Sequence, residues 1–427
     1  MSLTVIKIEP KFARMLLALV AFATLVAAWF FIKWNFANAV ASRIDTGQPE
    51  AASVAEWLVG LAPSDPQTHF ASARVFEKTF NPGDLTKSLI EYEAATALSP
   101  NHYVMWLSLG RARSLNGDDE SAAVAYALAL RLAPNYAAVQ WAYGNALIRQ
   151  GDTEQGFAMI ARAASANPDY ARTTALTALE MFAGDLNRVR QVLGDSDATN
   201  ASLAAVLAKQ GRFDEAFDAW SKLAEKPTKH AKLGAALIEQ MTTAKKFQFA
   251  AHISTDIQTG EGERPMTGQI SNGGFEGGVK LRNAGLFEWQ IAGGAQPQIG
   301  LAESGSHGGR YGLLAIFNSF ETAAFRSISQ TVPVMPGTVY EFEVFYKSDL
   351  KTQATLKWEI ADAGSSASLA TTAAMTPATD WTSLKVKFTA PAACDGVIIR
   401  LAREGCSGPS CPANGKMSFD DFSLRRL

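Results

Sequence analysis

Cysteine and histidine are scarce in this 427-residue chain, which contains three cysteines and five histidines. Three cysteines are too few for a scaffold built from disulfides, and no Cys-x-x-Cys pair indicates a zinc site. The histidines are scattered along the chain without the spacing of metal ligands. These absences argue against a metalloenzyme.

A strong excess of either charge is also absent. The 39 Lys and Arg residues and the 41 Asp and Glu residues leave a net charge of −2, which excludes a strong overall attraction to nucleic acid. Hydrophobic residues make up 48% of the chain and charged residues 19%, so the chain can bury substantial cores. Its length suits two or three domains.

Charge is missing entirely from residues 15–32, MLLALVAFATLVAAWFFI. A helix of this length would measure about 27 Å, close to the thickness of the bilayer core. Aromatic residues, which favour the membrane interface, gather at its far end: Trp29, Phe30, Phe31 and Trp34. The pattern predicts one transmembrane helix over residues 15–34.

Basic residues precede this run, namely Lys7, Lys11 and Arg14. Because positively charged flanks stay in the cytoplasm, we expect residues 1–14 to be cytoplasmic and the bulk of the chain to lie outside a bacterial inner membrane. Two alternatives stay open: a signal peptide cleaved at Ala37-Asn38-Ala39, and a helix buried in a soluble protein.

Proline and glycine recur with a period of 34 residues. The prolines are Pro66, Pro100, Pro134 and Pro168, and the glycines are Gly83, Gly117 and Gly151. The segments between these breaks are rich in Ala and Leu with helical spacing. Two interleaved breaks in each period predict two helices per repeat, with a glycine turn between them and a proline stop after them.

One repeat shows the most complete set of side chains: Trp106, Leu109, Gly110, Ala122, Tyr126, Ala129 and Pro134. This set resembles the tetratricopeptide (TPR) repeat, although Arg113 stands where that family prefers tyrosine, and the copy after Pro168 is degenerate. The resemblance implies an α-solenoid of paired helices over residues 50–255, whose concave surface holds a protein or peptide partner.

Candidate residues for such a partner groove lie in two successive repeats. Trp141, Asn145 and Arg149 are spaced four residues apart and share one helix face, and Arg111 corresponds to Asn145 one repeat earlier. We interpret them as an aromatic anchor with polar and guanidinium donors. In the alternative interpretation, Trp141 packs between repeats and the arginines are merely solvated.

The pattern changes after residues 256–269, a polar segment with glycine and proline that we interpret as a linker. Beyond it, apolar residues alternate with polar ones. The clearest alternating segments are residues 340–346, 356–360, 384–388 and 397–401. Such alternation predicts half-buried antiparallel strands, so residues 270–427 should form an all-β sandwich.

Several short motifs follow one another in this region: Asn272–Glu276 (NGGFE), Ser304–Gly309 (SGSHGG), Phe388–Pro391 (FTAP) and Phe419–Leu424 (FDDFSL). Their order resembles the carbohydrate-binding-module type of galactose-binding-like jelly roll. The resemblance implies a jelly-roll sandwich and a polysaccharide partner, while the same fold also serves as an adhesion or structural module.

The same resemblance implies a structural calcium ion. In that family the opening glutamate and the closing aspartate pair often hold calcium, and here they correspond to Glu276 and to Asp420 or Asp421. In the alternative interpretation these acids cap strands or pair with Arg310 or Lys416.

A sugar platform needs an aromatic ring that stacks on a pyranose and polar groups that bond its hydroxyls. Phe345 is the odd apolar residue on a polar strand face, and we expect Lys347 and Arg400 to share that face. The tryptophans expected in the core are Trp289, Trp358 and Trp381.

The three cysteines lie close together in sequence. Cys406 and Cys411 bracket a short loop of Gly, Pro and Ser, which could bring the two sulfurs together, and Cys394 would remain free. One disulfide with one free thiol fits an exported protein.

No region outside these three parts is long enough for a catalytic domain, and Glu341 and Glu343 are adjacent surface acids rather than a facing pair. We therefore expect a non-enzymatic, membrane-anchored scaffold that holds a protein partner on its TPR groove and a glycan on its jelly roll, in exopolysaccharide export or cell-envelope assembly. It would need no catalytic cofactor and no nucleic acid. The alternatives are an adhesion or envelope-structural protein whose sandwich binds protein, and, less favoured, an accessory part of a glycosidase.

Overall fold

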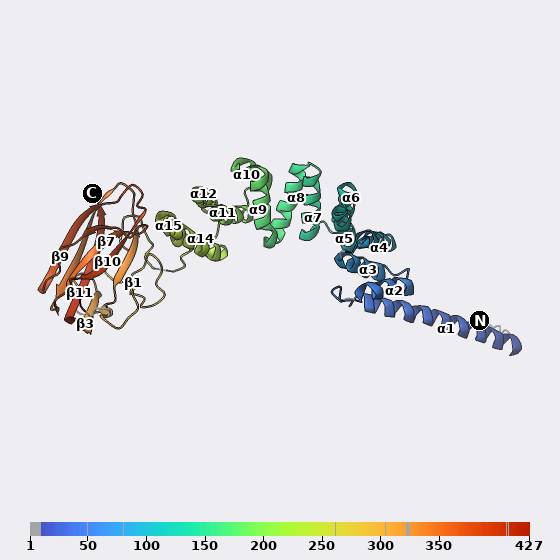
Figure 1. The fold of residues 1–427 in the computed structure, drawn as a ribbon, viewed down its shortest axis with the longest axis horizontal. Coiled ribbons are helices and arrows are strands. Elements are labelled where there is room, and N and C mark those ends of the chain that lie inside the picture. The colour runs from blue at the N-terminus through green and yellow to red at the C-terminus, as the bar shows by residue number, and fades with distance from the viewer. Residues whose placement is uncertain are drawn as a thin grey trace, which may run out of the picture. The chain divides into compact units, whose positions relative to one another are not determined.

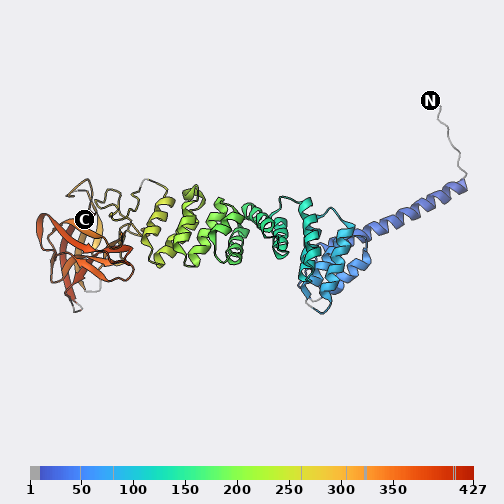
Figure 2. The same ribbon diagram turned by 90° about the horizontal axis from the view of Figure 1, so that it is seen from above.

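The computed structural model describes residues 10–48, 50–79, 81–260, 262–303, 305–321, 325–406, 408 and 410–427. Lys7 of the basic flank and Ser304 of the glycine-rich motif lie outside these described residues. The chain divides into two compact units, residues 1–199 and residues 200–427. The order of elements confirms the predicted fold class: an apolar N-terminal helix, helices as far as Ile257, and then an antiparallel β-sandwich (Figure 1, Figure 2).

The N-terminal helix α1 spans Pro10–Ala41 and has 32 residues. Its most apolar stretch of 18 residues is not buried against the protein, so by length and composition it fits a membrane anchor or a signal sequence. The helix continues without a break past residue 34. Its last turns carry the small residues Ala37 and Ala41, which are buried in a cluster with Leu58 and Ala71.

Helix pairs make up most of the first unit, after the single helix α2 (Ala51–Leu61). The pairs are α3 (Pro66–Thr79) with α4 (Asp84–Leu98), α5 (Tyr103–Leu115) with α6 (Asp119–Leu132), α7 (Ala137–Arg149) with α8 (Thr153–Ala166), and α9 (Pro168–Met181) with α10 (Leu186–Leu193). Gly83, Gly117 and Gly151 lie between the helices of three pairs with φ of 85°, 81° and 91°, a conformation that glycine adopts readily. The 34-residue period thus corresponds to one helix pair.

Two of the prolines that were predicted to end a helix instead begin the next one. Pro66 and Pro168 are themselves the first residues of α3 and α9. Proline is tolerated there because the first turn of a helix has no partner for the missing N–H group.

The two helices approach closely at a glycine in the pairs α5/α6 and α7/α8. A Cβ atom added at Gly110 would lie 2.6 Å from the ring of Tyr126, and one added at Gly144 would lie 2.6 Å from Ile160. Gly144 and Ile160 follow Gly110 and Tyr126 by one 34-residue period. The close approach at Gly110 and Tyr126 therefore repeats in the next pair.

The boundary between the two units falls inside α11 (Asp197–Lys209), and the helices from α11 onward lead directly onto the sandwich. The later helices are α12 (Phe213–Ser221), α13 (Lys226–Lys229), α14 (Ala231–Thr243) and α15 (Phe247–Ile257). Gln248 at the start of α15 donates from its side chain to the carbonyl of Val334 and from its backbone N–H to Asp395 (both 3.1 Å). Phe247 packs against Gly396. Helix α15 is thus bonded to the sandwich.

The sandwich consists of two sheets whose neighbouring strands are antiparallel. One has the order β1 (Gln290–Ile291), β4 (Ile328–Pro333), β10 (Gly396–Glu404), β7 (Thr355–Asp362) and β8 (Ser368–Thr371). The other has the order β2 (Gln298–Ala302), β3 (Gly312–Glu321), β11 (Ser410–Arg426), β5 (Val339–Ser348) and β9 (Ala378–Thr389), with β6 (Lys351–Thr352) paired to β11. Trp289, Trp358 and Phe342 are buried in the core between the two sheets.

The cysteines are arranged as the sequence suggested. Cys406 and Cys411 form a disulfide, and Cys394 is a buried free thiol. Burial raises the pKa of the Cys394 thiol to about 11, so this group is unreactive at neutral pH.

Candidate functional site

An aromatic cluster with one lysine lies on the outer face of the six-stranded sheet. Strand β5 directs Tyr346 into the core, and the alternation of side chains therefore directs Phe345 and Lys347 outward. The His307 ring stacks on Phe345 with centroids 3.9 Å apart, and Trp381 of β9 meets His307 edge to face at 5.5 Å. Lys347 Nζ lies 5.2 Å from the centre of a Trp381 ring. We call these four residues the aromatic cluster.

The loop after β2 holds His307 in place through the closing aspartate pair. The backbone N–H of His307 donates to Asp420 Oδ2 (2.7 Å), and His307 Nδ1 lies 2.6 Å from Asp421 Oδ2. Asp420 and Asp421 stand where the pairing of β11 with β5 shifts register. The shift brings these two acids to the loop, which fixes the His307 ring over Phe345.

Asp420 is fully buried, and backbone N–H groups satisfy it. Its Oδ2 accepts from His307 and Gly308, and its Oδ1 accepts from Asp421 at 2.8 Å. Burial raises the pKa of Asp420, and these N–H donors oppose that rise. The carboxyl therefore acts as a hydrogen-bond anchor for the loop.

Glu276 anchors the other end of the same loop. Its Oε1 accepts from the backbone N–H groups of Arg310 (2.7 Å) and Tyr311 (2.9 Å). Gly309 has a φ of +57°, and a Cβ atom there would lie 2.2 Å from Glu276 Oε1. Only glycine leaves room for this carboxylate.

The predicted calcium ligands do come together, because Glu276, Asp420 and Asp421 all contact the loop of residues 307–311. Their oxygen chemistry suits calcium. Their arrangement does not, because the oxygens face N–H donors, and among the described residues no group of three or more His, Cys, Asp or Glu side chains is placed to hold a metal ion. Arg310 pairs through its guanidinium with Glu303 (3.2 Å). Calcium binding at this cluster stays a prediction.

Two predictions about the sugar platform are wrong. Arg400 lies on β10 of the other sheet, where it pairs with Glu359 at 2.7 Å, so it cannot share a face with Phe345. Trp381 is half-buried on the outer face of its sheet, whereas Trp289 and Trp358 are buried as expected. Alternation within a strand shows which residues share a side of that strand, but it does not show which sheet the strand joins.

The acids Glu341 and Glu343 lie further along the same face. Glu343 pairs with Lys385 and Arg425 (both 2.9 Å), and Glu341 pairs with Arg425 at 3.4 Å. They are held by basic neighbours on the adjacent strands. This is the geometry of a surface ion-pair ladder, not of two carboxyl groups across a cleft.

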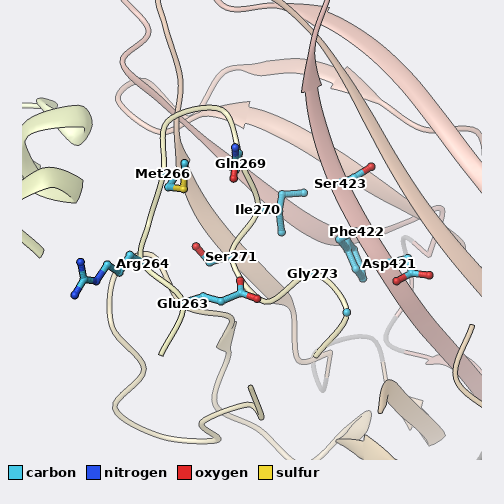
Figure 3. A pocket seen from close by; sticks show the side chains of 11 residues that line it. Glu263, Arg264, Met266, Gln269, Ile270, Ser271, Gly273, Asp421, Phe422 and Ser423 are labelled. Carbon is cyan, nitrogen blue, oxygen red and sulfur yellow. The ribbon is translucent and has the colours of Figure 1, made fainter. Parts of the chain in front are cut away.

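A pocket of about 640 Å³ lies beside the aspartate pair, between the segment of residues 263–274 and β11 (Figure 3). Its polar lining includes Glu263, Gln269 and Ser271 from the first segment and Asp421 and Ser423 from β11. Asp421 also contacts His307, so the pocket adjoins the aromatic cluster. The walls are held together by a hydrogen bond from the Phe422 N–H to the Gly273 carbonyl (3.0 Å).

Three of the predicted groove residues, Arg111, Trp141 and Arg149, contact neighbouring helices, whereas Asn145 bonds within α7. Arg111 makes two hydrogen bonds to Glu77 (2.8 and 2.9 Å). Arg149 bonds to Asp119 and Ser114, and Asn145 donates to the Trp141 carbonyl. Their donors are thus engaged within the protein. Trp141 stacks on Tyr170 with centroids 4.8 Å apart.

The repeats carry further aromatic residues that were not among the predicted groove residues. Tyr103 contacts Tyr136 with centroids 5.2 Å apart, and Tyr136 is more than half exposed. His102, Tyr136 and Tyr170 recur every 34 residues just after the prolines, and this spacing could have identified them. No comparable local signal marks His307 as the partner of Phe345, because the two are brought together only by the fold.

Residues 267–407 match the family model described as "Carbohydrate binding domain". None of the curated proteins matches the chain. Among solved structures, TmCBM61 in complex with β-1,4-galactotriose is 18% identical, with 36% of this chain and 96% of that chain covered and a TM-score of 0.27. The CBM22-1 xylan-binding domain of Paenibacillus barcinonensis Xyn10C is 16% identical (36% and 91% covered, TM-score 0.26), and a MamA RS-1 structure is 15% identical (45% and 91%, TM-score 0.29). At such TM-scores these similarities say nothing about ligands, and it is the family match that identifies the C-terminal β-sandwich as a carbohydrate-binding module.

Proposed function

We propose that this protein is a membrane-anchored scaffold whose sandwich binds a polysaccharide and whose TPR-like repeats hold a protein partner outside the inner membrane. The role is one of binding rather than catalysis. The observation that supports it best is the aromatic cluster on a domain that matches a carbohydrate-binding family. A setting in exopolysaccharide export or cell-envelope assembly would use both binding surfaces.

The aromatic cluster has the chemistry of a sugar platform. The rings of Trp381 and His307 offer apolar surface to the C–H face of a pyranose, and Lys347 and Asp421 offer a hydrogen-bond donor and an acceptor nearby. Phe345 lies beneath His307 and supports it. We infer that Trp381 and His307 contact the sugar and that Phe345 positions His307.

The anchor proposal draws on the way α1 ends. The alternative signal-peptide cleavage at Ala37-Asn38-Ala39 would remove Ala37, which is fully buried among the helices that follow. It would also remove Asn38, whose side chain lies 3.2 Å from both carboxylate oxygens of Asp65. A retained helix keeps these contacts, and we therefore favour an anchor over a cleaved signal peptide.

The protein-partner proposal draws on the exposed aromatic residues of the repeats. Tyr136 is more than half exposed, and the stacked pair of Trp141 and Tyr170 is half-buried. Such rings are suited to a protein or peptide ligand. The ion pairs of Arg111 with Glu77 and of Arg149 with Asp119 would hold successive helices in place beneath the bound partner.

A glycan-binding measurement on the full chain in detergent tests the sugar platform. Affinity electrophoresis against soluble polysaccharides should show retardation of the wild type by at least one of them. Trp381→Ala should weaken that binding by up to about tenfold, since a lost aromatic stacking contact is worth about 0.5–1.5 kcal/mol. The matched control is Lys387→Ala, which removes an exposed charge from the same sheet face outside the cluster. Equal retardation of both variants and the wild type would contradict the proposed site.

A further inference from the structure

Helix α2 carries an exposed tryptophan beside the end of the apolar helix. Its solvent-facing side consists of Ser53, Glu56, Trp57 and Gly60. Trp57 is 53% exposed, and its ring meets the ring of Phe36 from α1 edge to face at 6.2 Å. Phe36 is itself 52% exposed. The two rings thus form one apolar patch that the protein leaves uncovered.

The unbroken helix sets the depth of this patch relative to a bilayer. Phe36 follows Ile32, the last residue of the uncharged run, by four residues, which is about 6 Å along a helix. The headgroup layer on each side of the hydrocarbon core is about 5–7 Å thick. If the uncharged run fills the core, Phe36 lies at headgroup depth, and so does Trp57, which contacts it.

Rigid packing holds α2 at that depth. Ala37 and Ala41 of α1 are buried against Leu58 of α2, so no free linker separates the apolar helix from the first helices of the repeat region. This packing therefore fixes the position of Trp57 relative to α1.

The chemistry of the patch suits lipid headgroups. Tryptophan favours the membrane–water interface, and phenylalanine is common on the apolar face of helices that lie in it. The one acid on this face, Glu56, is neutralised by Lys87 at 3.0 Å.

We propose that α2 is an interfacial helix, which lies on the bilayer surface with Trp57 in the headgroup layer and seats the repeat region on the membrane. This inference rests on the proposed role of α1 as an anchor. It adds a second contact with lipid, made by an element outside the apolar run.

Depth-dependent fluorescence quenching tests the proposal on the full chain in vesicles of phosphatidylcholine and phosphatidylglycerol that contain headgroup-nitroxide lipid. A fluorophore on Gly60→Cys leaves Trp57 intact, and a Cβ atom at Gly60 meets nothing within 4 Å. The native cysteines do not compete for the label, because Cys394 is buried and the other two form a disulfide. The control site is Ser165→Cys, an exposed position at the end of α8.

We expect the nitroxide lipid to quench the label at residue 60 strongly and the label at residue 165 little. Trp57→Ser in the Gly60→Cys background should reduce the quenching at residue 60. A chain that survives an alkaline wash but shows equal quenching at both sites would overturn the seating of α2 and leave the anchor standing. Release of the chain by that wash would overturn both. A label shielded from nitroxide lipid and also from aqueous iodide would show that protein covers this face, and the proposal would be wrong.

Discussion

At the scale of single residues, His69 stabilises the repeats most strongly when its imidazole ring is protonated. Its Nδ1 lies 2.6 Å from a Glu91 carboxylate oxygen and its Nε2 lies 2.9 Å from the Pro63 carbonyl. Both partners are acceptors, so only the imidazolium form can donate to both at once. The hydrogen bond with Glu91 is the main reason that the pKa of His69 is raised.

The first prediction concerns the pH dependence of stability. Because the pKa of His69 is raised in the folded state, its stabilising contribution is fully present below the unfolded value of about 6.5 and is lost as the pH rises through the higher folded value. We expect the melting temperature of the helical region, followed by circular dichroism, to fall by more in the wild type than in His69→Gln as the pH rises from below 6.5 through the raised pKa of folded His69. Parallel pH profiles for the two proteins would show that His69 is not protonated in the folded state.

The buried carboxylate of Asp420 is expected to stabilise the sandwich as a hydrogen-bond acceptor. Its two oxygens accept three backbone N–H groups, and Asp420→Asn would leave only one acceptor oxygen for them. Leaving buried N–H groups without an acceptor should lower the stability of the sandwich by about 1–3 kcal/mol. The exposed acid Glu303 is the matched control, and Glu303→Gln should change the melting temperature little. A variant Asp420→Asn that melts like the control would contradict the role of this carboxyl as an anchor.

The same melting curves, recorded in calcium and in chelator, test the calcium prediction. Calcium that binds only the folded state would raise the melting temperature, by the equivalent of about 2.7 kcal/mol at one hundred times Kd. Glu276→Gln should remove most of that rise, and magnesium should replace calcium poorly. Coincident wild-type curves would leave Glu276 and the aspartate pair as acceptors for the loop N–H groups alone.

At the scale of elements, the sequence predicts periodic features well and pairings between distant segments poorly. The 34-residue recurrence of proline and glycine locates helix pairs, because each break has a local cause in one residue's backbone. The alternation over residues 340–346 locates β5 and its buried side. The placement of Arg400 failed because sheet membership depends on strands far apart in the chain. The reason for Trp381 is different, because it lies on the same side of β9 as Lys385 and Lys387, which is the outward side in the alternation of residues 384–388.

The candidate site shows the same limit. Phe345 and Lys347 are predictable because they are alternate residues of one strand. His307 comes from a loop far from both in sequence, and it reaches Phe345 only because a register shift in β11 presents Asp420 and Asp421 to that loop. A contact that depends on a register shift between distant strands leaves no periodic pattern in a single sequence.

At the scale of the whole molecule, the two compact units predict that damage to one helix pair stays local. Gly110→Leu would force the ring of Tyr126 away, since even a Cβ atom would lie 2.6 Å from it, and such overpacking costs about 1–3 kcal/mol. In a solenoid each repeat is stabilised mainly by its neighbours. Hydrogen exchange should therefore speed up in α5, α6 and the adjoining pairs while the sandwich keeps its protection. The control Gly60→Ala, which adds a methyl group where nothing lies within 4 Å, should not speed up exchange in either region. Equal loss of protection in the helices and in the sandwich would show that the chain unfolds as a single cooperative unit.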